Sequence, residues 1–244
     1  MARTALPGRL TWQVATVSAV RAETATARTL VLDIPGWPGH LPGQHLDVKL
    51  TAEDGYSAQR SYSIASDWPG EGPVEVTVQR LEDGEVSPYL TDVVEAGDQI
   101  EVRGPIGGWF VWRSAQPAPV LLVAGGSGIV PLMAMIRDRG RRRGRQPFRL
   151  IYSVRTPADG YYADELRRRV RDDPGLDVHF VHTRSGPGPN RRIDVATVNT
   201  YGWPPDFAPD VFVCGPTAFV ETVADILVAL GHDPKKVRTE RFGG

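Results

Sequence analysis

The chain has 244 residues, enough for one large domain or two smaller ones. Its 28 basic and 29 acidic residues give a formal net charge of -1, so its bulk electrostatics favour no nucleic-acid partner. Residues 1–7 hold no apolar stretch long enough for a signal peptide, and no run approaches the roughly 20 apolar residues that span a bilayer. These features predict a cytoplasmic protein without a membrane segment.

The cysteine content limits which redox centres the chain can hold. Cys214 is the single cysteine of the chain. One thiol cannot form an internal disulfide, and it cannot supply the roughly four thiolates that hold an iron–sulfur cluster. We therefore expect no metal centre, and we expect any electrons that the protein carries to leave to a separate molecule.

The first part of the chain has the patterns of β-strands. Alternating or β-branched residues predict strands at 10–14, 29–34, 45–50 and 74–80. Glycine and proline separate these strands, as at residues 35–39 and 42–43. Several short strands without a long helix predict a small antiparallel β-barrel.

The pattern changes after a linker at residues 114–119. The apolar run at 120–124 predicts a strand buried on both faces, and a helix is expected over 131–139. Further strands at 148–153, 176–180 and 210–214 alternate with helices at 163–171 and 218–230. This alternation predicts a doubly wound parallel sheet, and hence two domains at residues 1–113 and 118–244.

A short motif ends one of the barrel strands. Arg60 offers a charged fork for a phosphate, and Tyr62 offers an aromatic face for a flat ring. The strand period of two places both residues on one face, and Ser63 can bond a ring nitrogen. Taken alone, the same residues also fit an edge strand with a surface arginine and a half-buried tyrosine.

Two further motifs belong to the second domain. Glycines 125, 126 and 128, with Ser127, follow a predicted strand and precede a predicted helix, which lets a pyrophosphate approach the backbone. Pro131 fits an early helical position. Cys214 ends a later strand, before Gly215 and Pro216, at the edge where such sheets bind ligands. The alternatives are a plain strand–helix turn and a small buried cysteine.

In this order and at these distances, the three motifs resemble the ferredoxin–NADP reductase family, in which a flavin barrel precedes a nicotinamide-binding domain. The resemblance implies an FAD-dependent NAD(P)H reductase that passes electrons to a separate carrier, such as a ferredoxin, a flavodoxin or an oxygenase component. Two alternatives stay open. One is a reductase of small acceptors such as a ferric chelate or free flavin, and the other is a flavin-binding or sensor module that does not turn over.

The resemblance also assigns residues to the flavin. It places the first motif around the ring, and residues 84–87 at a short helix beneath the phosphates, where Ser87 would be a hydroxyl donor and helix cap. Arg80 lies where relatives hold the pyrophosphate, which favours FAD over FMN. A capped surface helix fits residues 84–87 equally well. The expected flavin-binding residues are Arg60, Ser61, Tyr62, Ser63, Val78, Arg80, Gly84, Glu85, Val86, Ser87 and Phe242.

The resemblance implies three catalytic residues: Ser63 at the flavin ring, and Cys214 and Glu240 beside the nicotinamide. Phe242 would shield the flavin, although an ordered tail that only packs is the alternative for the last residues. No acid directly follows the second strand of this domain, so nearby arginines favour NADPH over NADH. The expected nucleotide-binding residues are Gly125, Gly126, Ser127, Gly128, Arg155, Arg184, Ser185, Arg192, Cys214, Gly215 and Pro216.

Six arginines lie between residues 137 and 145. Cations at a helix end complement the helix dipole, and we interpret this run as a solvated loop. The alternative is a docking patch for an acidic electron carrier.

Overall fold

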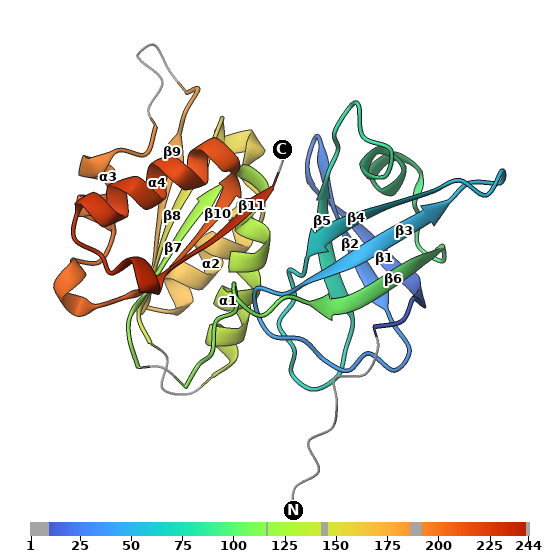
Figure 1. Ribbon diagram of the computed structural model, residues 1–244, viewed down its shortest axis with the longest axis horizontal. Coiled ribbons are helices and arrows are strands. Elements are labelled where there is room, and N and C mark those ends of the chain that lie inside the picture. Colours follow the sequence, from blue (N-terminus) through green and yellow to red (C-terminus); the bar gives the residue numbers. More distant parts are fainter. Residues whose placement is uncertain (1–9, 116, 143–145, 186–191, 243–244) are drawn as a thin grey trace, which may run out of the picture.

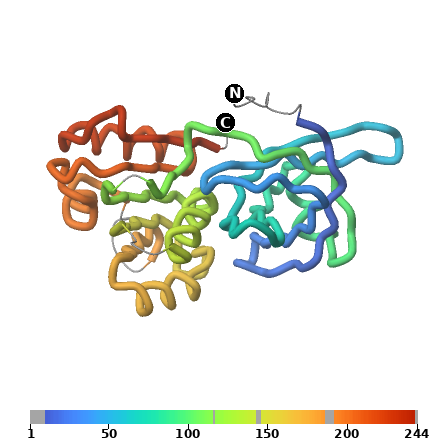
Figure 2. The backbone as a smooth tube through the Cα atoms, turned by 90° about the horizontal axis from the view of Figure 1, so that it is seen from below, coloured from blue at the N-terminus to red at the C-terminus, as the bar shows by residue number. Residues whose placement is uncertain are grey.

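The computed structural model describes residues 10–115, 117–142, 146–185 and 192–242. It contains an all-β half and an α/β half that lie side by side (Figure 1). Figure 2 shows the same halves from below, with the green segment that joins them along one side. Within the described residues, no helix has both the length and the apolarity needed to cross a membrane.

The all-β half is a six-stranded antiparallel sheet in the order β4-β3-β6-β1-β2-β5. An antiparallel bridge between Ile64 and Val76 connects the chain after β4 with β5, which curls the sheet into a barrel. The strands are β1 (Gln13–Thr24), β2 (Ala27–Asp33), β3 (His45–Thr51), β4 (Ser57–Ser63), β5 (Val74–Gln79) and β6 (Gln99–Ile106). The predicted antiparallel barrel is confirmed.

The first strand differs from the sequence prediction, and strand β6 was not predicted. We expected a strand at 10–14, whereas β1 runs from Gln13 to Thr24. Its register with β2 shifts between Val17 and Ala19, and again between Ala22 and Thr24. Each bulge breaks the two-residue alternation, so the sequence pattern conceals the strand.

The α/β half is a five-stranded parallel sheet in the order β11-β10-β7-β8-β9. After β9 the chain returns to the other side of β7, which creates a switch point between β7 and β10. Ligands bind at the carboxyl ends of the strands at such a point. The strands are β7 (Val120–Gly125), β8 (Phe148–Val154), β9 (Leu176–His182), β10 (Asp210–Pro216) and β11 (Val237–Phe242).

Helices cover both faces of this sheet (Figure 1). Leu122 and Leu150 belong to the core with α1 and α2, while Leu121 and Ile151 belong to the core with α3 and α4. Both faces of each central strand are therefore buried, which explains the continuous apolar runs. The helices are α1 (Ile129–Arg141), α2 (Ala163–Asp172), α3 (Val195–Tyr201) and α4 (Thr217–Ala229). The doubly wound architecture is confirmed, although α3 and strand β11 were not predicted.

Short helical turns complete the described elements. A π-helical turn spans Tyr89–Val93, and 3-10 turns span Gly126–Gly128, Pro157–Asp159, Pro205–Phe207 and Pro234–Lys236. The segment between β6 and β7 holds no helix or strand at its described residues, as the predicted linker requires.

The arginine run differs from its interpretation as a solvated loop. The side chains of Arg137 and Arg139 are only 12% and 2% exposed, so the interpretation is wrong for both. Arg143 and Arg145 lie outside the described residues. The four described arginines of the run ion-pair within the chain: Arg137 with Glu75 and Glu165, Arg139 with Asp173, Arg141 with Asp67 and Asp138, and Arg142 with Asp138.

Gly128 provides a test of how α1 is seated on the sheet. A Cβ atom at this position would lie 2.1 Å from the carbonyl oxygen of Cys214, so β10 would have to move. We expect Gly128→Ala to lower the free energy of unfolding by about 1–3 kcal/mol in chemical denaturation. Gly108→Ala is the control, because an added Cβ there meets nothing within 4 Å. Equal effects of the two substitutions would contradict the packing.

Candidate active site

The first predicted motif lies at the carboxyl end of β4. Arg60 pairs with Val48 of β3, and Tyr62 pairs with Leu46. Both β3 residues are fully buried in the barrel core, so Arg60 and Tyr62 share the inward-facing side of β4, as the strand period predicts. Ser63 ends the strand.

Tyr62 is suited to lie against a planar ring. It packs against the barrel core while remaining partly exposed. Burial raises the pKa of its phenol to about 12. The hydroxyl therefore stays protonated near neutral pH and can donate a hydrogen bond.

Both arginines expected at the flavin phosphates are paired with exposed carboxylates. Arg60 lies 3.1 Å from Glu85, and Arg80 lies 2.8 Å from Asp92. Exposed ion pairs contribute little to stability, so a phosphate could replace either carboxylate at little cost. The sequence placed Glu85 at the cofactor, and the structure shows it as the partner of Arg60.

Ser87 does not cap a helix, which corrects the sequence prediction. Its Oγ accepts a hydrogen bond from the backbone N–H of Leu81 at 3.1 Å. The helical turn Tyr89–Val93 does follow, but it has no side-chain cap. A Cβ on Gly84 would lie 2.8 Å from the Ser87 oxygen, so the glycine makes room for this bond.

Three other expected flavin residues have side chains committed elsewhere. Ser61 points away from Tyr62 and donates to Asp47 Oδ1 at 2.7 Å. Val78 and Val86 are 0% and 1% exposed within the barrel core. Only their backbone groups could contact a cofactor.

The two motifs of the second domain meet at the switch point. Gly125 ends β7, and Gly126 begins the turn before α1 with a left-handed φ of +54°. A Cβ on Gly215 would lie 3.2 Å from the Cα of Gly125. Segments about 90 residues apart in the sequence are thus in direct backbone contact, and glycine permits that approach.

A cleft of about 250 Å³ opens at this point between the two halves of the molecule. Its walls include the residues Gly125, Gly126, Ser127, Ser153, Arg155, Thr183, Pro216, Phe219 and Phe242 from the α/β half, and Thr24, Thr26 and Gln79 from the barrel. The barrel residues were missed, because no local pattern marks a threonine or glutamine that meets another domain.

Asp159 and Tyr161 also line the cleft and were missed. The sequence analysis sought an acid directly after β8, whereas Asp159 is brought back by the 3-10 turn Pro157–Asp159. Its Oδ2 accepts bonds from the backbone N–H of Thr156 at 2.9 Å and from the Thr156 hydroxyl at 2.6 Å.

The expected nucleotide arginines divide into two groups. Arg155 lines the cleft. Arg184 does not line it, but its backbone N–H donates to the Arg155 carbonyl at 2.8 Å, so the two residues are neighbours. Ser185 follows and is exposed. Arg192 is exposed shortly before α3 and is not among the cleft-lining residues.

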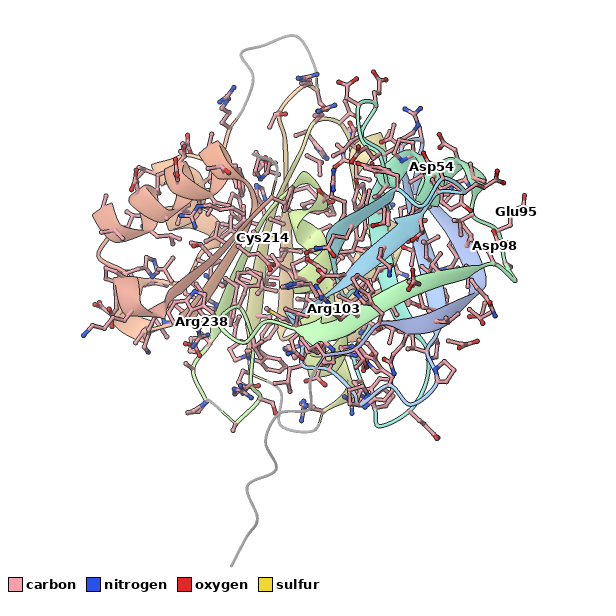
Figure 3. All side chains as sticks on the ribbon, turned by 45° about the vertical axis from the view of Figure 1, so that its right-hand side comes forward. Asp54, Glu95, Asp98, Arg103, Cys214 and Arg238 are labelled. Atoms are coloured by element: carbon pink, nitrogen blue, oxygen red, sulfur yellow. The ribbon has the colours of Figure 1, made fainter. Side chains whose placement is uncertain are left out.

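Cys214, which is fully buried, and the half-buried Glu240 form a pair on adjacent strands. They are register partners in β10 and β11, and the thiol donates to Glu240 Oε2 at 3.8 Å. Figure 3 shows Cys214 within the parallel sheet, near the centre of the molecule. Burial, followed by the charge of Glu240, raises the pKa of the thiol well above its ordinary value. The thiol therefore stays protonated, which suits a steric and polar role rather than a nucleophilic one.

Two family models match the chain, one in each half. Residues 15–111 match the oxidoreductase FAD-binding domain, and residues 122–225 match the oxidoreductase NAD-binding domain. The chain belongs to the ferredoxin–NADP reductase-like oxidoreductases. In this chain the FAD-binding match precedes the NAD-binding match.

Two relatives in the family are reductase components. The chain is 33% identical over 208 residues to the glycine betaine monooxygenase reductase subunit of Chromohalobacter salexigens, covering 83% of this chain and 56% of that protein. It is 27% identical over 234 residues to the ferredoxin–NAD(P)(+) reductase component of naphthalene 1,2-dioxygenase/salicylate 5-hydroxylase systems from Ralstonia sp, covering 93% of this chain and 68% of that protein. The chain thus spans between half and about two thirds of these relatives.

Solved structures share the fold. The FAD/NAD-binding domain of nitric oxide dioxygenase from Vibrio cholerae superimposes with a TM-score of 0.84 at 23% identity, covering 95% of this chain and 99% of that one. A ferredoxin–NADP+ reductase from Neisseria gonorrhoeae with bound FAD and NADP gives 0.80 at 19% identity, covering 94% and 98%.

Glu240 gives the site a testable pH dependence. Burial raises the pKa of its carboxyl from 4.5 to about 7, so the folded state holds a proton that the unfolded state releases. Its contribution to stability is therefore complete below pH 4.5 and is lost as the pH rises through 7. We expect the free energy of unfolding of Glu240→Gln, measured by urea denaturation, to rise by roughly 1–3 kcal/mol relative to that of the parent protein between about pH 5 and pH 8. A difference that stays constant with pH would contradict the buried carboxyl.

Proposed function

We propose that the protein takes a hydride from NAD(P)H onto FAD and passes the electrons to a separate carrier protein, such as a ferredoxin or an oxygenase component. The observation that carries this proposal is the cleft at the switch point, where both halves contribute walls and the glycine turn meets the end of β10. The reductase components among the relatives support the carrier as acceptor.

The barrel residues fit an FAD molecule. Arg60 and Arg80 would hold its phosphates in place of their present carboxylate partners. Tyr62 would lie against the ring, and Ser63 would hydrogen-bond the ring nitrogen at the end of β4. Bound FAD would supply the redox chemistry, accepting a hydride equivalent and releasing electrons singly.

The second domain fits a nicotinamide nucleotide. The glycine turn presents backbone N–H groups next to the start of α1, where the helix dipole favours a pyrophosphate. Cys214 and Glu240 would shape the nicotinamide subsite, and Glu240 can hold or release a proton near neutral pH. Phe242, which pairs with Pro216 and lines the cleft, would cover the flavin.

For the nucleotide itself we propose NADPH. Arg155 and Arg184 are neighbours beside the cleft, and arginine suits the additional phosphate of NADPH. Asp159 is the observation that favours NADH, because a carboxylate in the same cleft suits the ribose hydroxyls of that nucleotide.

The boundary between the two domains at residues 113–118 and the cytoplasmic location of the protein stay predictions.

An anaerobic titration tests this function. The purified protein, loaded with FAD, is titrated with NADPH and then NADH while the flavin absorbance at about 450 nm is followed. We expect both nucleotides to bleach the flavin, with NADPH effective at lower concentration. A preference for NADH would assign discrimination to Asp159 rather than to the two arginines. A yellow protein that neither nucleotide bleaches would identify a flavin-binding module and overturn the proposal.

Ser63 can be tested separately from FAD binding. We expect Ser63→Ala to retain FAD but to slow its reduction by roughly 10- to 100-fold, because a hydrogen bond to the reacting ring atom is lost. Stopped-flow absorbance measures the rate, and the visible spectrum measures bound FAD. Ser57→Ala, at the exposed start of the same strand, is the matched control. Unchanged reduction kinetics would remove Ser63 from the mechanism.

A further inference from the structure

Tyr162 closes a ring of hydrogen bonds between the two domains. It lies directly before α2, and it is only 6% exposed. Its hydroxyl bonds the hydroxyl of Thr77 in β5, which lies 2.6 Å from that of Thr29 in β2. Thr29 donates to Glu23 Oε1 at 2.7 Å, and Glu23 Oε2 accepts the backbone N–H of Tyr162 at 3.2 Å. We call these four residues the interdomain ring.

The direction of each bond in the interdomain ring follows from the supply of protons. A hydroxyl carries one proton, and Thr29 gives its proton to Glu23. Thr77 must therefore donate to Thr29, and Tyr162 must donate to Thr77. Every hydroxyl points toward the same carboxylate, so loss of one proton leaves a buried oxygen without its donor. Such a loss costs more than the net value of one hydrogen bond.

Local backbone structure supports both ends of the ring. The β1–β2 register shifts between Ala22 and Thr24, which makes Glu23 the extra residue of a bulge. Bulges redirect side chains, and this one turns a carboxylate toward the other domain. At the opposite end, Tyr162 has left-handed φ and ψ values of 55° and 20°. Residues other than glycine rarely adopt this region because their Cβ is crowded there, so surrounding contacts must hold Tyr162 in it.

A group of ion pairs lies beside the interdomain ring. The guanidinium of Arg137 lies 5.1 Å from the centre of the aromatic ring of Tyr162. It bonds Glu75 of β5 at 2.8 Å and Glu165 of α2 at 2.6 Å, and it donates to the carbonyl of Ala65. The barrel and the α/β half are thus joined by charges as well as by hydroxyl groups at the same place.

The nucleotide cleft lies next to the ring. Thr24, which follows Glu23 in the chain, lines the cleft, and so does Tyr161, which precedes Tyr162. Gln79, two residues beyond Thr77, lines it as well. Any shift of the ring therefore displaces the cleft wall that the barrel contributes.

We infer that Tyr162 is a positioning residue, which through the interdomain ring fixes the barrel wall of the cleft against the nucleotide-binding domain for hydride transfer. This inference rests on the proposed function. The interdomain ring would act by holding the two domains in a fixed relative position, because small misplacements of reacting groups reduce rates strongly.

Two variants of the FAD-loaded full chain test the inference, Tyr162→Phe and Thr77→Val, each of which removes one hydroxyl and keeps the shape. We expect the limiting rate of flavin reduction to fall about 10- to 100-fold, while the nucleotide dissociation constant changes less than about threefold. The double variant should lose no more than Thr77→Val alone, because Thr77→Val already removes the bond that Tyr162→Phe breaks, together with the bond to Thr29. Tyr201→Phe, an exposed tyrosine on α3, is the matched control.

Hydrogen exchange supplies a readout that does not depend on turnover. We expect faster exchange of the Tyr162 amide and of the β1–β2 hairpin in both variants, without a change in the core of the parallel sheet. Parent-like reduction rates and exchange in both variants would overturn the inference. If the parent protein is not reduced by either nucleotide, the proposed function fails, and parent-like exchange in the variants would then also refute the ring.

Discussion

The contact between the two domains is the constraint on which the site depends, because neither domain alone encloses the cleft. The α/β half contributes the glycine turn and the end of β10, whereas the barrel contributes the β1–β2 hairpin and the end of β5. This contact is largely polar, with Arg137 held between Glu75 and Glu165 and with a buried chain of hydroxyl groups beside it. Polar contacts of this kind are directional, so they favour one relative placement over others of similar buried area.

Close backbone packing is the second requirement. The glycine turn can approach the end of β10 because Gly128 and Gly215 have no Cβ, and Gly125 leaves room for the ring of Phe219 in α4. The backbone N–H groups and the first turn of α1 then lie beside Cys214 at the switch point of the sheet. Doubly wound sheets generally bind ligands at the switch point, and here three glycines leave the space for a pocket at that point.

Burial sets the chemistry of the groups that remain. Cys214 and Glu240 are neighbours in the sheet, and desolvation keeps the thiol protonated and brings the carboxyl pKa to about 7. Arg60 and Arg80, in contrast, are held by exposed carboxylates that a cofactor phosphate can replace. The site thus combines a fixed, buried part beside the expected nicotinamide with an exchangeable, charged part beside the expected phosphates.

The sequence by itself determined the features that depend on local order. The period of two placed Arg60 and Tyr62 on one face of β4, and a glycine-rich turn between an apolar strand and a helix located the switch point. Together with their spacing, these motifs identified the family. Element ends were predicted less well where bulges disturb the pattern, as in β1, and the short, charged strand β11 was not predicted.

Only the tertiary structure decided which residues meet across the domains. It added Thr24, Gln79 and Asp159 to the cleft, left Arg192 outside its walls, and converted Arg137 from a surface charge into a buried link. It also changed the role of Ser87, whose hydroxyl bonds a backbone six residues away instead of capping a helix. These outcomes depend on strand register and on domain docking, which are set by contacts between residues far apart in the chain. A local pattern encodes the face on which a side chain lies, but not the partner that covers that face.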